Sequence, residues 1–148
     1  MKIKSPAFKP DGAIPTKYAC DGENINPPLE FLDVPQTAKS LVLIVDDPDA
    51  PGGTWVHWTV WNINPKLGKV EENSKGLGVE GLTSFGKSGY GGPCPPDREH
   101  RYFFKLYALD CLLELDESSD KTQLLSALQG HILEECELVG RYNRTRLN

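Results

Sequence analysis

The chain has 148 residues, enough for one domain with a hydrophobic core of its own, and we expect residues 1–148 to form a single domain. Its 16 Lys and Arg stand against 21 Asp and Glu, which gives a formal charge of −5. This acidic balance argues against a nucleic-acid-binding protein, which needs a dense cationic surface. No apolar run approaches the roughly 20 residues that cross a bilayer, and the first residues lack the apolar segment of a signal peptide. We therefore expect a cytoplasmic protein without a transmembrane segment.

Four cysteines are spread along the chain, namely Cys20, Cys94, Cys111 and Cys136. None belongs to a C-x-x-C pair of the kind that binds zinc or forms a redox dithiol. Because the cytosol is reducing, the sequence favours free thiols. A disulfide is the alternative, and four cysteines allow three pairings.

The 14 glycines and 12 prolines are distributed rather than pooled, which is typical of short strands joined by turns. The apolar run Leu41–Val45 predicts a central strand buried on both faces. Shorter strands are expected at Leu29–Leu32 and in the region after Ser5.

Two further strands are predicted by aromatic and β-branched residues. In Trp55–Ile63, a period of two sets these residues on one face: Trp55, His57, Thr59 and Trp61. In Arg101–Leu109, the same period sets these residues on one face: Tyr102, Phe104, Leu106 and Ala108. A long turn-rich stretch, Gly86–Pro96, precedes the second of these strands.

One helix is predicted near the end of the chain, after cap candidates at Ser118–Asp120. Its apolar residues recur at steps of three and four: Leu124, Leu125, Leu128, Ile132, Leu133 and Cys136. The pattern places His131 on this helix, without a carboxylate at metal-ligand spacing, and favours a structural role for it. The chain is thus predicted to be mainly β, an antiparallel β-sandwich with this C-terminal helix laid against it.

Polar residues at the strand ends form a candidate anion site. Asp47 ends the central strand, where neighbouring strands bring it near His57, and His100 and Tyr102 leave the same face of their strand. Imidazolium and phenol groups donate hydrogen bonds, and the glycine-rich turn 88–92 offers backbone N–H groups. Asp47 is expected to orient His57 or to accept from an amine on the ligand.

Other chemistries fit the residues less well. Ser84 and Ser88 lack the G-x-S-x-G surroundings of a hydrolase nucleophile. Cys94 is a candidate nucleophile near His100, but prolines flank it and no helix N-terminus lowers its pKa. A His/His/Asp metal site also matches the residue types.

Four ordered motifs resemble the phosphatidylethanolamine-binding protein family, which includes the Raf kinase inhibitor proteins. They are Asp47–Pro51, Trp55–Asn62, Tyr90–Pro96 and His100–Tyr102. The resemblance runs from about Ser5 to Tyr142 and is strongest to the short bacterial and archaeal members.

The resemblance implies a β-sandwich with peripheral helices and a small anion pocket at one end. It places Asp47, Pro51, His57, His100 and Tyr102 in the pocket, and the loop Gly92–Pro96, with Gly92 and Pro93 as binding residues, at its rim. One proline of the loop after the central strand is expected to be cis.

The function expected from the resemblance is non-enzymatic binding of phosphate-type ligands or phospholipid head groups, with no cofactor and no metal. The alternative is inhibition of a serine protease or a protein kinase through the rim or a surface loop. A homodimer is compatible with the sequence, which does not indicate one.

Overall fold

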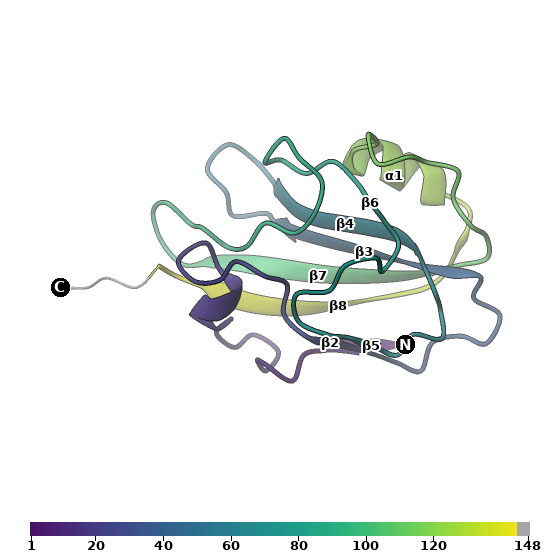
Figure 1. Ribbon diagram of the computed structural model, residues 1–148, viewed down its shortest axis with the longest axis horizontal. Helices are drawn as coiled ribbons and strands as arrows, with labels where there is room; N and C mark the ends of the chain where they lie inside the picture. The colour runs from purple at the N-terminus through teal and green to yellow at the C-terminus, as the bar shows by residue number, and fades with distance from the viewer. Residues whose placement is uncertain (145–148) are drawn as a thin grey trace.

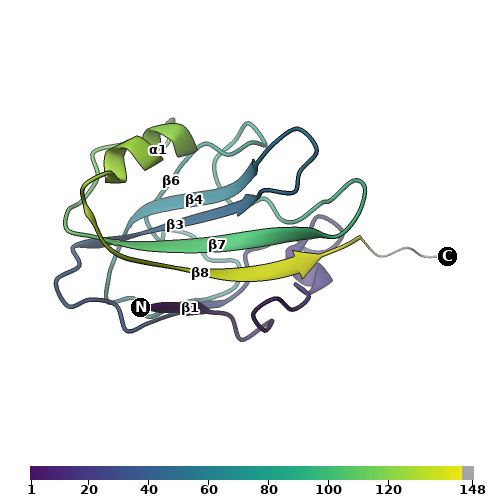
Figure 2. The same ribbon diagram turned by 180° about the vertical axis from the view of Figure 1, so that it is seen from behind.

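The computed structural model describes residues 1–144, which fold into two antiparallel β-sheets and one α-helix (Figures 1 and 2). The larger sheet has the strand order β6-β4-β3-β7-β8, and the smaller has the order β1-β2-β5. The strands are β1 (Lys2–Lys4), β2 (Leu29–Leu32), β3 (Ser40–Asp47), β4 (Trp55–Ile63), β5 (Lys69–Val70), β6 (Val79–Glu80), β7 (His100–Leu109) and β8 (Ile132–Tyr142); the helix α1 spans Lys121–Leu128. The predicted antiparallel β-sandwich is confirmed.

Strand β3 lies at the centre of the larger sheet, and every one of its residues is buried. Leu41, Leu43 and Val45 face the core that the two sheets share. Val42 and Ile44 face a second apolar cluster, which α1 covers on the outer side of the sheet. The strand predicted to be buried on both faces is therefore confirmed, and its continuous apolar run reflects cover on both sides.

The helix α1 is shorter than predicted. It begins with a capping box in which the Asp120 side chain accepts from the N–H of Gln123, and the Gln123 side chain accepts from the N–H of Asp120. It ends at Leu128, and Gly130 turns the chain with a φ of 80° that glycine adopts without strain. The prediction of a helix continuing to Cys136 is wrong.

Residues 132–142 instead form β8, which pairs with β7 from one end to the other. Ile132 lies opposite Leu109, and Tyr142 lies opposite His100. This ladder satisfies the backbone of β8, and alternate residues towards its end, Leu138 and Tyr142, are buried in the shared core. Long-range pairing outweighs the helical spacing of the apolar residues.

Strand β7 has the predicted alternation, since Tyr102, Phe104, Leu106 and Ala108 all lie in the core between the sheets. Strand β4 departs from its predicted alternation. Val45 pairs with Trp58 while Asp46 pairs with Val56, so His57 is the extra residue of a β-bulge.

The bulge changes the face on which His57 lies. Its ring centroid is 5.2 Å from that of Tyr102, on the side of β4 that Trp58 also occupies. Trp61 packs in the other cluster, beneath α1. The prediction that His57 shares a face with Trp61 is therefore wrong.

The smaller sheet closes the core. The strand expected at Leu29–Leu32 is β2, but its partner β1 precedes Ser5 rather than following it. The segment after Ser5 makes isolated bridges instead, from Phe8 to Ser5 and from Ala13 to Arg141. Ile3 and Phe31 of this sheet are buried in the shared core. Within residues 1–144, no helix is long and apolar enough to cross a membrane.

Candidate ligand-binding site

A cavity of about 530 Å³ opens where β3 and β4 meet the start of β7. Five of the predicted site residues line it, namely Asp47, Pro51, His57, His100 and Tyr102. Its outer wall adds Trp55, Phe85, Pro95 and Pro96, so most of the lining is apolar. A pocket with apolar walls and a few convergent polar groups is typical of small-molecule sites.

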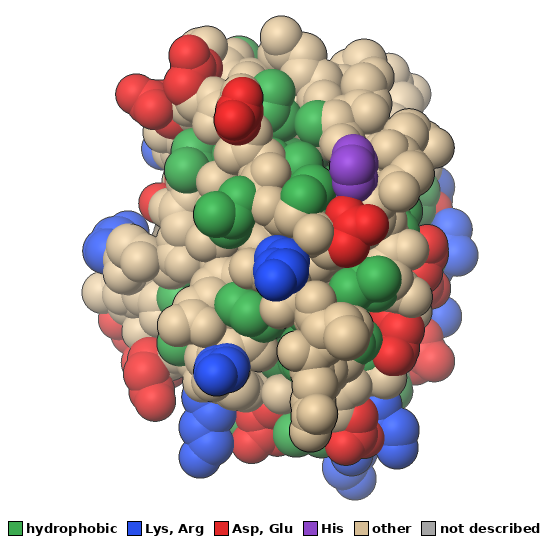
Figure 3. Space-filling view, turned by 90° about the vertical axis from the view of Figure 1, so that its right-hand side faces the viewer, with side chains coloured by type: hydrophobic (Ala, Val, Ile, Leu, Met, Phe, Trp, Pro, Cys, Tyr) green, Lys and Arg blue, Asp and Glu red, His purple; other side chains and the backbone are tan. Residues whose placement is uncertain are grey.

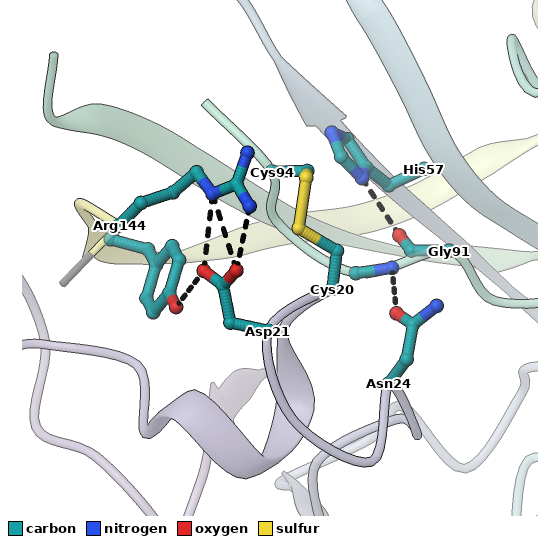
Figure 4. Close-up of a disulfide and its surroundings, with 9 residues drawn as sticks. Cys20, Asp21, Asn24, His57, Gly91, Cys94 and Arg144 are labelled. Atoms are coloured by element: carbon teal, nitrogen blue, oxygen red, sulfur yellow. Dashed lines mark hydrogen bonds and ion pairs between the residues drawn. A yellow bond between two sulfur atoms is a disulfide. The ribbon is translucent and has the colours of Figure 1, made fainter. Parts of the chain in front are cut away.

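His57 lies in the cavity wall with one ring nitrogen committed. Its Nδ1 is 2.7 Å from the carbonyl oxygen of Gly91. Figure 4 marks this contact with a dashed line. A carbonyl only accepts, so Nδ1 carries the proton and Nε2 is the nitrogen left for a ligand. Burial lowers the pKa of His57 below its usual 6.5, so the imidazole is neutral at pH 7.

Tyr102 brings an unused hydroxyl to the same place. The residue is 1% exposed, and its Oη has no hydrogen-bond partner among residues 1–144. Burial raises the pKa of the phenol, which therefore stays protonated and able to donate. A buried hydroxyl without a partner is uncommon, because leaving it unpaired costs roughly 1–3 kcal/mol.

His100 lies between two carboxylates. Its Nδ1 is 2.6 Å from Asp47 Oδ2, and its Nε2 is 2.7 Å from Asp97 Oδ1. Because an ionised carboxylate only accepts, both contacts together require a proton on each ring nitrogen. Asp47 thus orients His100; the expectation that it orients His57 is wrong, because Gly91 takes that role.

Asp97 is the residue of the site that the sequence did not indicate. It is about half exposed, it directly follows Pro96 of the cavity wall, and the hydrogen bond from His100 lowers its pKa. Its position three residues before His100 was available as a signal, but only the fold brings its carboxylate to the imidazole. The nitrogen of His100 that faces outward is therefore already bound to an anion from the chain itself.

The loop after β3 is held by Asp49, which accepts three hydrogen bonds from Arg101. The backbone N–H and Nε of Arg101 both lie 2.9 Å from Asp49 Oδ2, and Nη2 lies 2.8 Å from Oδ1. These bonds lower the pKa of the Asp49 carboxyl far below its usual range. They fix the loop that carries Pro51 against the first residues of β7.

The Asp49 contacts predict a dependence of stability on pH. The pKa of Asp49 is lower in the folded protein than in the unfolded chain, where it is about 3.9. The ionised carboxylate therefore contributes its full stabilisation above about pH 3.9, and this stabilisation is lost as the pH falls below that value. Asp49→Asn should therefore destabilise the protein at pH 7, and urea unfolding at pH 7 and pH 2.5 should show the difference from wild type shrinking in acid. Glu117→Gln, at an exposed acid, serves as the control. An equal difference at both pH values would contradict this account.

The turn after β3 contains no cis proline. Every peptide bond within residues 1–144 is trans, so that expectation is wrong. The turn is closed without it, because the Asp47 side chain accepts from the N–H of Asp49 at 2.8 Å, and Gly53 N–H donates to the Ala50 carbonyl at 3.1 Å.

Gly92 and Pro93, both predicted to form the rim, lie behind it and are not among the lining residues. Gly92 N–H donates to Asn24 Oδ1 at 2.8 Å, and a Cβ there would lie 2.3 Å from the Tyr18 carbonyl oxygen. The Pro93 carbonyl accepts from the N–H of Cys20. These two residues therefore dock the loop onto residues 18–24, and Cys94–Pro96 form the rim.

A disulfide joins Cys20 to Cys94 beside these contacts (Figure 4). The expectation of four free thiols is wrong for this pair, because the docked loops bring the two cysteines together across 74 residues of sequence. Cys111 and Cys136 are free. The disulfide also removes Cys94 as a candidate nucleophile.

The fold and the site define an antiparallel β-sandwich with a small pocket, holding a few polar groups, at one end of the central strands of its larger sheet. The sequence pattern of the phosphatidylethanolamine-binding protein family matches residues 4–143. The chain belongs to this family.

Similar chains cover almost its whole length. A UPF0098 protein of Methanothermobacter thermautotrophicus is 49% identical over 97% of this chain and 99% of its own, and one of Chlamydia trachomatis is 48% identical over 97% and 99%. Among solved structures, a putative phosphatidylethanolamine-binding protein homologue from Chlamydia trachomatis superposes with a TM-score of 0.95 at 47% identity, covering 97% of each chain. Escherichia coli YbcL superposes with a TM-score of 0.90 at 30% identity, covering 97% and 98%.

Proposed function

We propose that the protein is a non-enzymatic binding protein whose cavity takes a small ligand with a phosphate-type or carboxylate anion, such as a phospholipid head group. The observation that carries this proposal is the buried Tyr102 hydroxyl, which has no partner in the described part of the chain and lies beside the Nε2 side of His57. Membership of a family described as phosphatidylethanolamine-binding supports the same class of ligand.

The two groups suit a singly protonated phosphate. Tyr102 donates to one phosphate oxygen, and the neutral His57 accepts the proton of a P–OH group at Nε2 or takes it up as an imidazolium. His100, oriented by Asp47, donates to the ligand from Nε2 once the Asp97 carboxylate has moved aside. In this proposal Asp47 positions His100 and does not meet an amine, because its two oxygens already serve His100 and Asp49.

The contacts of the potential nucleophiles support the proposal of a binding role without catalysis. Ser84 Oγ accepts from the N–H of Val56 at 2.8 Å, which ties this serine to the strand rather than to a histidine. Cys94 is consumed by the disulfide. Neither group meets the requirement that a nucleophile lie within hydrogen-bond reach of a base.

Removing the Tyr102 hydroxyl should weaken phosphate binding. We expect Tyr102→Phe to raise the dissociation constant for O-phosphorylethanolamine about tenfold, since a hydrogen bond to a charged group contributes roughly 1.5 kcal/mol or more. Calorimetric titration at pH 6 and pH 8 should also show tighter wild-type binding at pH 6, because the bound phosphate and His57 share a proton. Tyr107→Phe, on the opposite face of β7, is the matched control.

An NMR titration of the histidines separates the pocket from the rest of the molecule. Binding should shift the signals of His57 and raise its pKa, since an anion favours the imidazolium. His131 lies beside Asp110, at the end of β7 away from the cavity, and its signals should not shift when the ligand is added. Wild-type affinity in Tyr102→Phe, or an unchanged His57, would refute the proposed site.

Inhibition of a protease or kinase is the second candidate function, and an exposed aromatic pair favours it. Trp55 and Phe85 are each 40% exposed and pack edge to face, with centroids 5.5 Å apart, beside the cavity. Aromatic side chains of this kind are enriched in protein interfaces. If Trp55→Ala loses inhibition but still binds phosphate, the partner binds at the rim. If Tyr102→Phe loses inhibition and phosphate binding together, the partner binds at the pocket.

A cytoplasmic location remains a prediction. Disulfides such as Cys20–Cys94 are typical of oxidising compartments, with intracellular proteins of hyperthermophiles as the exception. The redox state of this pair in cells therefore bears directly on where the protein works.

A further inference from the structure

A second group of chemically reactive side chains lies at the far end of β7 from the cavity. Asp110 and Cys111 directly follow β7, and His131 directly precedes β8. A carboxylate oxygen, a thiol sulfur and an imidazole nitrogen of these three residues all lie within 4.8 Å of one another. Figure 3 shows this end of the molecule, with a histidine at the surface beside an acidic side chain.

The sequence pattern does not indicate this group of residues. His131 seemed structural because it was expected on a helix with no carboxylate at ligand spacing. In the fold, the chain leaves α1 before His131, whose Nδ1 lies 2.8 Å from Oδ1 of Asp110, 21 residues earlier. The pairing of β7 with β8 creates the juxtaposition.

The backbone holds the three residues in place. Asp110 N–H donates to the carbonyl of His131 at 3.0 Å, and His131 N–H donates to the carbonyl of Leu128 at 3.1 Å. The carbonyl of Cys111 accepts from Ser40 Oγ at 2.6 Å. The two segments are therefore fixed relative to each other, and only side-chain rotations are needed to adjust the three ligand atoms.

We propose that Asp110, Cys111 and His131 form a binding site for Zn²⁺. Thiolate sulfur, imidazole nitrogen and carboxylate oxygen are the ligands that zinc takes in proteins, with bonds of about 2.0 to 2.3 Å. Tetrahedral coordination at those lengths places ligand atoms roughly 3.3 to 3.8 Å apart. The three ligand atoms here already lie within 4.8 Å of one another, so small side-chain rotations would bring them to that spacing. A water molecule completes the set. The thiolate and imidazole favour zinc over Mg²⁺ or Ca²⁺, which prefer oxygen ligands.

The ion would replace a proton in the existing contact. His131 now donates from Nδ1 to Asp110. On coordination this proton would leave Nδ1, to Nε2 or to solvent, and the Cys111 thiol would release its own proton to solvent as the thiolate binds the metal. His131 and Asp110 are each about half exposed, so solvent and metal reach the group without any movement of the backbone. Zinc would then join the end of β7 to the start of β8, and the site is separate from the proposed phosphate pocket.

Titration with Co²⁺ tests the proposal on the whole protein with its disulfide intact. Co²⁺ substitutes for Zn²⁺, and its charge-transfer absorption band reports coordination by a thiolate. Wild type and Cys136→Ser, which removes the other free thiol, should bind one equivalent and show this band. Cys111→Ser should abolish the band, and His131→Ala should weaken binding more than about tenfold. Zn²⁺ should displace the cobalt and raise the melting temperature of wild type but not of Cys111→Ser.

Three results would overturn the site. One is a charge-transfer band that survives in Cys111→Ser or disappears in Cys136→Ser. Another is binding that His131→Ala leaves unchanged. The third is the absence of the band at millimolar Co²⁺. Far-ultraviolet circular dichroism of each variant keeps a loss of binding distinct from a loss of fold, and O-phosphorylethanolamine binding should be the same in all of them.

Discussion

Loss of the Cys20–Cys94 disulfide is expected to lower the free energy of unfolding by about 4 kcal/mol. The bond closes a loop across 74 residues, and chain-entropy arguments for a loop of that length give a stabilisation of this size. The background for the measurement is a protein with Cys111→Ser and Cys136→Ser, in which no free thiol can exchange with the disulfide. Urea unfolding of this background, with and without the further changes Cys20→Ser and Cys94→Ser, measures the effect.

The same comparison distinguishes the disulfide from the loop contacts around it. Asn24 still accepts from Gly92 N–H, and the Tyr90 hydroxyl still donates to the Tyr18 carbonyl at 2.7 Å after the bond is removed. We therefore expect phosphate affinity to fall less than stability does. A stability loss below about 1 kcal/mol would mean that these contacts alone dock the loop.

The disulfide fixes the rim to a segment near the N-terminus, 74 residues earlier in the sequence. Cys94 belongs to the loop whose next two residues, Pro95 and Pro96, form the cavity wall. Cys20 follows the short 3-10 turn at Thr16–Tyr18, which contributes Tyr18 to the shared core. The geometry of the pocket entrance therefore depends on a core contact near the N-terminus.

The strongest sequence predictions came from patterns that one strand contains within itself. The buried run of β3 and the alternation of β7 were predicted correctly, because burial on one or two faces leaves a local signature. His100 and Tyr102 were placed on one face by that alternation. Both line the cavity together with Asp47.

Errors arose where the outcome depends on pairing between distant segments. A β-bulge is decided by the register between β3 and β4, so its effect on His57 has no local signal. The helix was extended because apolar residues after Gly130 also fit a helical period. Apolar residues also alternate from Cys136 to Tyr142, which is typical of a strand. Pairing with β7 decides between the two patterns in favour of the strand.

Charge placement shows the same limit. The sequence places Asp47, His57 and His100 in one group, but it does not say which histidine Asp47 binds. That depends on the Gly91 carbonyl, which binds His57, and on the turn before β7, which positions His100. Asp97 and Asp110 look like ordinary loop acids in the sequence. Each nevertheless faces a histidine in the fold, at 2.7 Å and 2.8 Å respectively.

Replacing Asp97 by Ala should strengthen phosphate binding between about ten- and a hundredfold. The Asp97 carboxylate holds His100 Nε2 at 2.7 Å, so a phosphate oxygen that binds there must first displace it. Asp97→Ala removes both this competitor and its negative charge from beside His100. Charge-assisted hydrogen bonds are strong enough to account for an effect of this size. Calorimetric titration with inorganic phosphate and with O-phosphorylethanolamine provides the measurement.

Glu99→Ala is the matched control, because it removes the same charge from the same turn without touching His100. Glu99 pairs at 3.7 Å with Arg141 instead. If both variants gain the same affinity for phosphate, the gain comes from the lower negative charge of the turn, and it should shrink as the ionic strength rises. His100 is then not a ligand. If Asp97→Ala alone gains affinity, and the gain persists in salt, then the chain's own carboxylate occupies the anion position in the free protein. Ligand binding is then an exchange of anions on His100, and its affinity depends on how readily Asp97 leaves.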